Sequence, residues 1–497
     1  MTLKSKMITK SLLLASFFVL TALSWCFQYY YTAWLIWFSY VPFLIVITDL
    51  KGSGAKIVFS TYAILLISCF CSFNWLLLLS KNQLLGGLAI SIGAVAQSIP
   101  YIIFLLIWNK TKNQRAVWLL PFLVAIGEYL WWHLKITPPV PLAHTQAPLT
   151  FVSQYVDLFG NTAATFMIML INVTVFRYWQ LRKSFNFIAA RIIFILTFPV
   201  CYSIGRVWQY HTQTLHYFKD GLSITLFRLD MPSDGEDLFQ NSKEDFKRLE
   251  RNVYLTDSIS YFERQAKQPS DLYVWHEGAF NRRIPRLNKY VQNIILGNKV
   301  PVLTGINELD SLTNSPINGS MVFYPDGSMS SPYIKMNFVT YWENEYKRGN
   351  KYVMHSVKNK NNDSFNIATP ICIEQFIPEH WAAFRKKGAD IFIEICFETW
   401  FRNGFGVEPG LSNITALRCM ENKVYGARTS NGGAAAFFNP VGISYQSTRS
   451  EEVLKGKIYK SNFSMTIYTR FPWIGITVVS MGFILFFINV INNPKVE

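Results

Sequence analysis

Three residues whose side chains could together break and form an acyl bond stand at the ends of predicted strands. They are Glu277 in VWHEGAF, Lys335 in YIKMNF and Cys372 in PICIEQF. A thiol that attacks a carbonyl needs a proton acceptor, and a partly desolvated carboxylate can serve. It also needs a fixed positive charge where the tetrahedral oxyanion develops. Glutamate, lysine and cysteine meet these needs, so the set predicts nucleophilic acyl chemistry.

The segment around Cys372 predicts a buried strand that runs into a turn, followed by a helix over 377–387. Free N–H groups and the positive end of the dipole at the start of that helix would favour a thiolate over a thiol. The plainer alternative is a small core residue, since free cysteine is among the most buried residue types. Glu277 has a similar alternative as a strand-end salt-bridge partner, and Lys335 as a solvated hairpin residue.

The elements that must position these residues form a pattern of short strands and helices from about residue 222 to 464, which predicts one α/β domain. A hairpin turning at Asp326-Gly327 leads to Lys335. The basic stretch 346–363 is the one long segment without predicted structure. The other predicted strands cover 223–229, 271–277, 301–306, 389–397 and 434–444, and helices are expected near 286–295 and 412–425.

A long amphipathic helix is predicted over 242–267. Its apolar spacing predicts a buried face formed by Phe246, Leu249, Val253, Ile259 and Phe262. This face is expected to pack against the strands of the α/β domain.

The rest of the chain is of another kind. The 497 residues are 51% hydrophobic with a net charge of +16, too apolar for an ordinary soluble enzyme and too charged for a protein that lies in the membrane throughout. Eight apolar runs are long enough, or nearly so, to span a bilayer. They cover 11–27, 32–50, 57–79, 84–108, 117–134, 160–176, 188–205 and 471–491.

Basic residues indicate the orientation of these spans. They gather at the amino end and in every second loop, which places the amino terminus in the cytoplasm. Seven crossings then deliver the polar region to the opposite side of the membrane. The expected domains are a seven-helix transmembrane bundle over 1–206, a catalytic domain over 207–466 and a C-terminal transmembrane helix over 467–497.

Glu128, in LVAIGEYLWWHL, is a carboxylate within a predicted span. A charged group at mid-helix costs about 2.5–3.5 kcal/mol on insertion scales, so this side chain should face the bundle or the interface. Functional and structural roles are both open for it. The seven cysteines form no CxxC pair and no cluster with histidine, which predicts free thiols and no metal site.

The catalytic candidates lie in motifs that together resemble a known family. WHEGAF, YIKMNFVTYWENEY, PICIEQF, IFIEICFETWF and LRCMENKVYGARTSNGGAAAFFNPVG resemble, in order, the motifs of the nitrilase superfamily. The resemblance is strongest to its membrane branch, the apolipoprotein N-acyltransferases. AWLIWFSYVPFLI resembles an early proline-containing span of that branch, and AHTQAPLTFVSQYVDLFGNTAATFMIMLIN its glutamine-containing loop and following helix.

The resemblance implies an αββα sandwich in which Glu277 is the general base. Lys335 would stabilise the oxyanion, and Cys372 would be the nucleophile that carries the acyl group. No metal or diffusible cofactor is implied, and no nucleic-acid partner.

Five further residues acquire expected roles from the resemblance. Glu343 and Glu374 match two family glutamates that support the site. Trp400, Phe401 and Phe405 fall in a segment, 398–410, that matches a lid-like loop of the family. They would meet acyl chains there, although a hydrophobic rim without a ligand is compatible with the same residues.

The chain departs from the family pattern at three places. His276 stands where the family usually has proline, and Ile373 where it has an aromatic residue. Residues 340–342 replace a proline-aromatic-glycine segment before Glu343, which makes a different loop shape expected there. The chain is thus expected to be a divergent member with altered acyl-donor or acceptor preference.

The function that follows from the resemblance is two-step acyl transfer in the cell inner membrane, with the catalytic domain on the periplasmic side. Cys372 would take a fatty acyl group from a membrane phospholipid and pass it to the α-amine of a diacylated apolipoprotein. A membrane-tethered amidase or nitrile hydrolase with the same three residues is the first alternative, and a non-catalytic membrane relative is the second. Eight spans count against the first, because tethering needs only one. The intact Glu, Lys and Cys count against the second.

Overall fold

The computed structural model describes residues 3–26, 30–50, 53–77, 83–111, 113–134, 141–214, 221–231, 242–281, 291–293, 297–339, 343, 345–399 and 407–492. The chain forms two compact units. The membrane unit comprises Met1–Arg206, Gly404–Asn413 and Phe471–Glu497, and the sheet unit comprises Val207–Asn403 and Ile414–Arg470.

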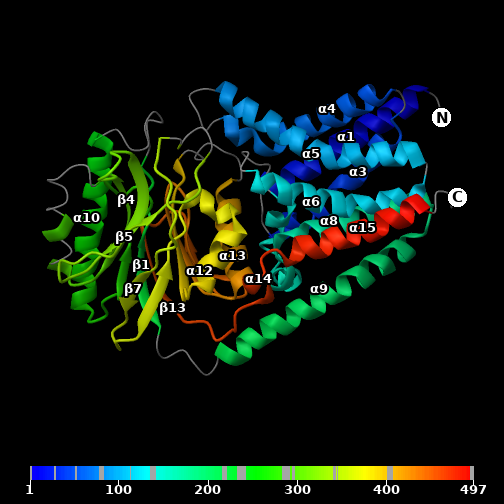
Figure 1. Cartoon of the computed structure of the whole chain (residues 1–497). Helices are drawn as coiled ribbons and strands as arrows, with labels where there is room; N and C mark the ends of the chain where they lie inside the picture. The colour runs from blue at the N-terminus through cyan, green and yellow to red at the C-terminus, as the bar shows by residue number, and fades with distance from the viewer. Residues whose placement is uncertain are drawn as a thin grey trace. The chain divides into compact units, whose positions relative to one another are not determined.

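Eight helical segments in the described residues are long and apolar enough to cross a membrane, which agrees with the eight predicted spans. All eight contribute to the membrane unit, and each is long enough to match the apolar thickness of a bilayer. The elements of this part of the chain are α1 (Leu3–Cys26), α2 (Tyr30–Ala33), α3 (Ile36–Thr48), α4 (Gly54–Phe73), η1 (Asn74–Leu77), α5 (Gln83–Thr111), η2 (Gln114–Leu119), α6 (Leu120–His133), η3 (Leu142–Gln146), α7 (Thr150–Ser153), α8 (Val156–Gln180), α9 (Phe185–Thr214) and α15 (Ile474–Asn492) (Figure 1).

Polar residues inside these helices are used within the bundle. The side chain of Asn172 on α8 accepts a hydrogen bond from the Tyr40 N–H (2.9 Å) and donates one to the Ile36 carbonyl (3.0 Å). An unbroken helical turn of α3 would pair those two backbone groups directly. The amide therefore gives both groups hydrogen-bond partners away from water and joins α8 to α3.

The sheet unit contains two mixed sheets, one of seven strands and one of six. In the first, the strands lie in the order β13-β1-β2-β4-β5-β6, with β3 beside β4. In the second, the order is β12-β11-β10-β9-β8-β7. The bounds are β1 (Leu222–Phe227), β2 (Leu272–Val274), β3 (Phe280–Asn281), β4 (Val302–Leu309), β5 (Pro316–Phe323), β6 (Tyr333–Ile334), β7 (His355–Lys358), β8 (Ser364–Ala368), β9 (Ile391–Phe397), β10 (Gly426–Asn431), β11 (Ala435–Phe438), β12 (Ser444–Thr448) and β13 (Val453–Ile458).

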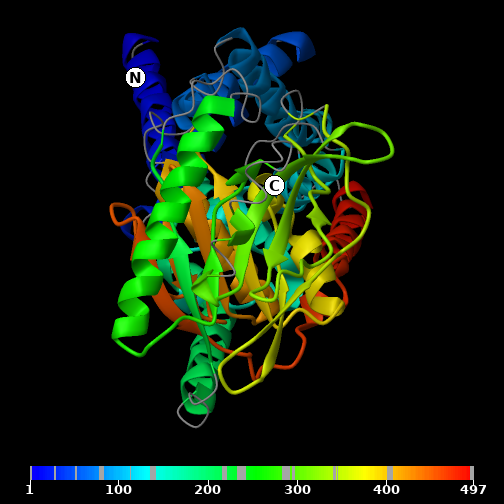
Figure 2. The ribbon, with the colours of Figure 1, turned by 90° about the vertical axis from the view of Figure 1, so that its left-hand side faces the viewer.

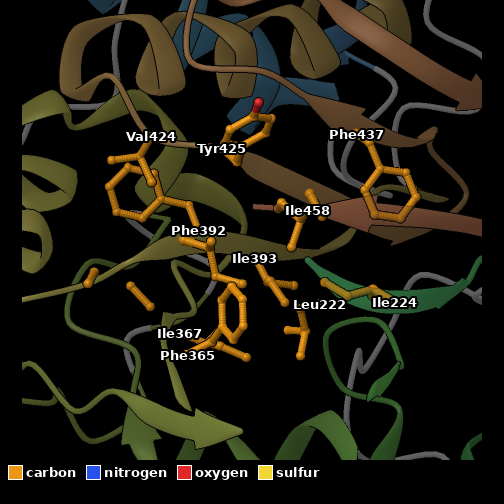
Figure 3. Close-up of a cluster of buried hydrophobic side chains, with 14 of the residues drawn as sticks. Leu222, Ile224, Phe365, Ile367, Phe392, Ile393, Val424, Tyr425, Phe437 and Ile458 are labelled. Atoms are coloured by element: carbon orange, nitrogen blue, oxygen red, sulfur yellow. The ribbon is translucent and has the colours of Figure 1, made fainter. Parts of the chain in front are cut away.

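The two sheets pack face to face, with helices on their outer faces (Figures 1 and 2). Between the sheets lies an apolar core to which Leu222 and Ile224 contribute from one sheet and Ile367 and Ile393 from the other (Figure 3). Outside them lie α10 (Ser242–Gln265), η4 (Cys372–Phe376), α12 (Pro378–Lys386), α13 (Val407–Asn422) and α14 (Ile467–Arg470). The unit is the expected αββα sandwich of nitrilase type.

The strands divide their side chains between these layers by simple alternation. Leu272 and Val274 of β2 point into the core between the sheets. Tyr273 and the following Trp275 belong instead to a second cluster, which includes Leu249 and Val253 of α10. Glu277 stands in the turn that follows, after Trp275 and His276, so the packing of β2 on both faces positions the segment that carries its carboxylate.

Helix α10 corrects one prediction. Leu249 and Val253 are buried, but Phe246 is 41% exposed and Phe262 is 65% exposed. The buried face instead includes Asn252 and Thr256, whose side chains hydrogen-bond to the sheet layer. A polar buried face misleads a prediction that follows apolar spacing alone.

Of the other predicted elements, one is confirmed and several have different bounds. The hairpin turning at Gly327 is confirmed, with β5 and β6 antiparallel. The stretch 346–363 is not unstructured throughout, because β7 lies within it and pairs with β8. Helix α13 begins at Val407, five residues before the predicted start. Most of the helix predicted near 286–295 lies outside the described residues.

Candidate active site

Cys372 lies at the first residue of η4, just beyond strand β8. Its φ of +49° is in the left-handed region, which is costly for a residue with a side chain. The preceding Ile371 is held on both sides of its backbone, by a β-bridge to Ile395 and by an N–H···O bond to Glu374 (2.9 Å). The surrounding contacts therefore impose the turn that presents the thiol.

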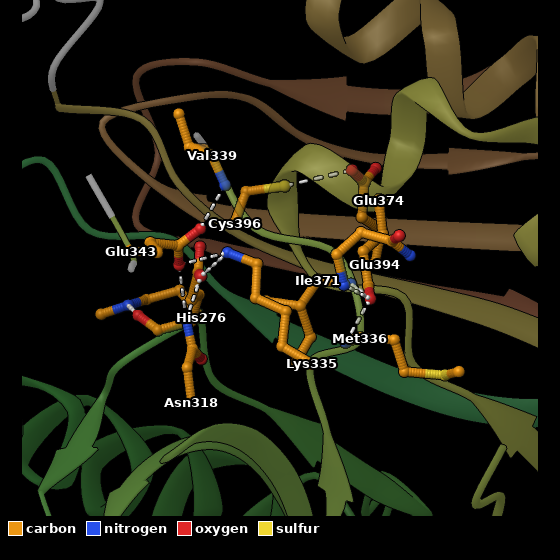
Figure 4. A network of polar contacts seen from close by, with 12 residues as sticks. His276, Asn318, Lys335, Met336, Val339, Glu343, Ile371, Glu374, Glu394 and Cys396 are labelled. Carbon is orange, nitrogen blue, oxygen red and sulfur yellow. Dashed lines mark hydrogen bonds and ion pairs between the residues drawn. The ribbon is translucent and has the colours of Figure 1, made fainter. Parts of the chain in front are cut away.

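Glu277 and Lys335 form a buried ion pair, and Figure 4 shows Lys335 with Glu343 and Asn318 in the same cluster. The Lys335 ammonium donates to Glu277 Oε1 at 3.0 Å and to Glu343 Oε1 at 2.7 Å. The Asn318 amide on β5 also donates to both carboxylates, at 2.8 Å and 3.3 Å. Glu343 is anchored in turn by the Val339 N–H (2.8 Å). One ammonium thus holds two carboxylates, and the cluster has a net negative charge.

Proton affinity in this cluster follows from burial and charge. Burial, reinforced by the charge of Glu343, raises the pKa of Glu277 above its ordinary value, even though Lys335 opposes the rise. Burial alone would lower the pKa of Lys335, but the charges of Glu277 and Glu343 hold it well above the usual range. The lysine is therefore a permanent cation, and Glu277 is a carboxylate with increased affinity for a proton.

Cys372 lies within electrostatic reach of both Glu277 and Lys335. The neighbouring Cys396 thiol lowers the pKa of Cys372, but burial and the charge of Glu277 outweigh this effect and raise the pKa overall. The predicted preference for a thiolate is therefore wrong for the resting site. Helix α12 begins only at Pro378, which has no N–H to offer, so its dipole does not start at the thiol.

Glu374 connects the cysteine segment to the lysine segment. It accepts backbone N–H groups from Met336 (2.8 Å) and Asn337 (3.1 Å), directly after Lys335, as well as from Ile371. Burial would raise the pKa of Glu374, but the nearby His380 and the N–H donors lower it below the ordinary value. Glu374 is therefore a fully engaged carboxylate that fixes two loops to each other.

His276 stands at the first departure from the family pattern. Its Nδ1 lies 2.7 Å from the Glu277 carbonyl oxygen, and its Nε2 lies 3.3 Å from the Asn252 amide. Burial lowers the pKa of His276 to about 3, so the ring is neutral near pH 7 and Nδ1–H donates to that carbonyl. The histidine thereby fixes the backbone of Glu277 by a hydrogen bond.

A second polar cluster beside Cys372 was missed from the sequence. Glu394, Cys396 and Glu398 alternate along and just beyond β9, and Arg428 on β10 forms ion pairs with both glutamates. The Cys396 thiol donates to Glu394 (3.2 Å) and accepts from Arg428 (3.4 Å). The spacing of the three residues in IFIEICFE, which puts them on one face of a strand, was the available signal.

The remaining predicted residues fall into two groups. Ile373 is partly exposed next to the thiol. Trp400, Phe401 and Phe405 lie outside the described residues, as do residues 340–342. Their expected roles therefore stay predictions.

Two family models match the chain. The model described as apolipoprotein N-acyltransferase N-terminal domain matches residues 16–174, and the carbon-nitrogen hydrolase model matches residues 292–461. An apolipoprotein N-acyltransferase of Chlorobaculum tepidum is 22% identical over 484 residues, covering 88% of each chain. One from Bdellovibrio bacteriovorus is 21% identical over 500 residues, covering 90% of this chain and 88% of its own.

Among solved structures, a Saccharomyces cerevisiae member of branch 10 of the nitrilase superfamily is 18% identical with a TM-score of 0.38. The match covers 48% of this chain and 90% of the yeast protein. The family models match both the helical part and the sheet part of the chain. The chain therefore belongs, as a distant member, to the apolipoprotein N-acyltransferase family within the nitrilase superfamily.

Proposed function

We propose that the protein transfers a fatty acyl group from a membrane phospholipid, through a thioester on Cys372, to the α-amine of a diacylated apolipoprotein. The observation that carries the proposal is a buried Glu277–Lys335 ion pair near the partly exposed Cys372, in a chain with eight candidate membrane helices. Family membership supports the same substrates, because the relatives bear the name of this activity.

In the first half-reaction, Glu277 accepts the thiol proton as Cys372 Sγ attacks the ester carbonyl. Lys335 stabilises the oxyanion that develops on the carbonyl oxygen. The carbon–oxygen bond then breaks, the proton passes from Glu277 to the departing alkoxide, and lysophospholipid is released. The raised pKa of Glu277 supports this shuttle, since a stronger base takes a proton more readily from a thiol.

In the second half-reaction, the unprotonated amine of the acceptor attacks the thioester. Glu277 takes a proton from the nitrogen, the carbon–sulfur bond breaks to leave an amide, and Glu277 returns the proton to the departing sulfur, which restores the thiol. A thioester survives in such a cycle only if water is kept away, which a site next to a bilayer favours. We place the sheet unit on the periplasmic face of the inner membrane, as the distribution of basic residues indicates.

The direct test incubates the purified full-length protein with phospholipid and a synthetic diacylated lipopeptide. We expect an amide-linked third chain on the peptide, with an equal amount of lysophospholipid, and neither product with Cys372→Ala. Free fatty acid with unmodified peptide would instead identify a membrane-tethered hydrolase. Transfer by the Cys372→Ala variant would reject the mechanism.

A further inference from the structure

A pocket within the membrane unit is formed by α3, α5, α6 and η3, and its residues take no part in the chemistry proposed above. Its empty space, open solvent included, is about 350 Å³. Of its lining residues, Tyr40, Tyr101 and Leu142 are buried, whereas Gln97 and Glu128 are partly exposed. It is therefore a partly open recess whose lining includes a carboxylate.

The charge of Glu128 needs an explanation in this setting. Its Oε1 accepts the Leu142 N–H (3.0 Å), and its Oε2 accepts the Thr165 hydroxyl (2.5 Å). Both donors are neutral, so they satisfy hydrogen bonds without balancing the charge. A carboxylate within a membrane span is costly when it is not compensated. Each carboxylate oxygen of Glu128 has a second lone pair, which can accept a hydrogen bond from a cation in the pocket.

Other groups in the pocket suit a primary ammonium. Pro100 lies inside α5 and has no N–H, so the Ala96 carbonyl four residues earlier lacks its usual intrahelical donor. The Tyr40 and Tyr101 rings also line the pocket, as a stacked pair with centroids 5.9 Å apart. An –NH₃⁺ group has three N–H donors. It could therefore donate to the Glu128 carboxylate and to the Ala96 carbonyl oxygen at the same time.

One group that lines the pocket is a hydrogen-bond donor, not an acceptor. Trp131 lies one helical turn after Glu128 on α6 and lines the same pocket. Its indole N–H is buried and has no acceptor in the described part of the chain. A ligand with an oxygen near its ammonium group would satisfy this donor while Glu128 binds the charge.

From this arrangement we propose that the pocket binds the primary ammonium of an amphiphile that carries an acceptor oxygen a few bonds away. Two sources share that chemistry, the aminoethyl phosphate head group of a phospholipid and the free amino terminus of a diacylated lipopeptide. The binding involves no covalent step. The proposal does not depend on acyl transfer by Cys372.

The test uses the full-length Cys372→Ala protein, so that no turnover interferes. It is reconstituted in nanodiscs of mixed phosphatidylethanolamine, phosphatidylcholine and phosphatidylglycerol, and the retained lipids are counted by native mass spectrometry. We expect phosphatidylethanolamine to be retained over both others. Adding Glu128→Gln should reduce that preference by about tenfold or more, the loss expected for one charge-assisted hydrogen bond. A parallel arm offers the diacylated lipopeptide, with and without an acetylated amine.

Matched variants separate binding from structure. Thr165→Val removes one hydrogen bond to Glu128 but keeps its charge, and Asp49→Asn removes an exposed carboxylate paired with Lys10, so both should retain the preference. Trp131→Phe should weaken retention of the amine lipid. Retention of the lipopeptide alone, lost on acetylation and on Glu128→Gln, would support the site and identify the acceptor as its ligand. Equal retention of all lipids and peptides by the parent protein, or equal losses in Thr165→Val and Glu128→Gln, would overturn the proposal.

Discussion

Two buried glutamates in the sheet unit, Glu277 and Glu374, differ in what surrounds their carboxylates. Glu277 shares one ammonium with a second carboxylate, and its pKa is raised. Glu374 is surrounded by three backbone N–H groups, the Tyr333 hydroxyl and His380, and its pKa is lowered. The first is prepared to take a proton, whereas the second is stabilised as an anion. A buried carboxylate that lacks full compensation is thus the one suited to catalysis.

The largest effect is expected at Glu277. Glu277→Gln removes the proton acceptor and should lower the transfer rate by about 10²–10⁴-fold. Because the fold raises the pKa of this carboxyl and so favours its neutral form, the apparent melting temperature at pH 7 should stay the same or rise. Transfer assays and thermal unfolding of the same preparation check both parts. A large loss of stability would mean that Glu277 is structural and would remove the contrast with Glu374.

The opposite outcome is expected at Glu374. Glu374→Gln breaks a fully buried network and should cost about 3 kcal/mol of stability. Activity per folded molecule should fall far less than in Glu277→Gln. The lowered pKa of Glu374 means that its stabilisation is present above the ordinary carboxyl pKa and is lost as the pH falls through the lowered value. Melting temperatures from pH 7 downward should therefore fall more steeply for the parent protein than for the variant.

A smaller change is expected at Glu343. Its charge raises the pKa of Glu277, so Glu343→Gln should lower that pKa and move the rising limb of the pH–rate profile to lower pH. The rate at the optimum should fall by about tenfold or less, because Lys335 keeps its bond to Glu277. An unshifted profile would show that the two carboxylates are not coupled as their distances to Lys335 indicate.

The smallest change is expected at Cys396. Its thiol lowers the pKa of Cys372, so Cys396→Ala should raise that pKa and move thiol alkylation to higher pH. Because a thiol is a weak donor, the rate at fixed pH should change by less than about tenfold. Cys419→Ala, a second buried thiol on α13, is the matched control and should leave the alkylation profile unchanged.

Much of this arrangement could be predicted from the sequence. Long apolar runs predicted the eight spans. The family resemblance, not the strand-end positions alone, predicted that Glu277, Lys335 and Cys372 form one site, and Glu277 and Lys335 form an ion pair in the structure. Glu343 and Glu374 were expected to support the site, and the structure places both in hydrogen-bond networks next to it. Their roles in catalysis follow only from experiments such as those above.

The rest could not be predicted, because it depends on contacts between distant segments. Asn318 holds two carboxylates across 41 and 25 residues of sequence, and nothing in its local pattern marks it. The pKa of Cys372 depends on Glu277, in the turn after β2, and on Cys396, on β9. Helix α10 shows the same limit, since its buried face carries Asn252 and Thr256 to meet polar groups of another layer.

The proposed transfer requires an acyl group bound to the sulfur atom of Cys372. The purified protein should be incubated with phospholipid alone, quenched at acid pH and analysed by peptide mass spectrometry. We predict a mass increase of one acyl chain on the peptide that contains Cys372, removed by hydroxylamine and strongly reduced in Glu277→Gln. An active preparation in which Cys372 never carries an acyl chain would contradict the account.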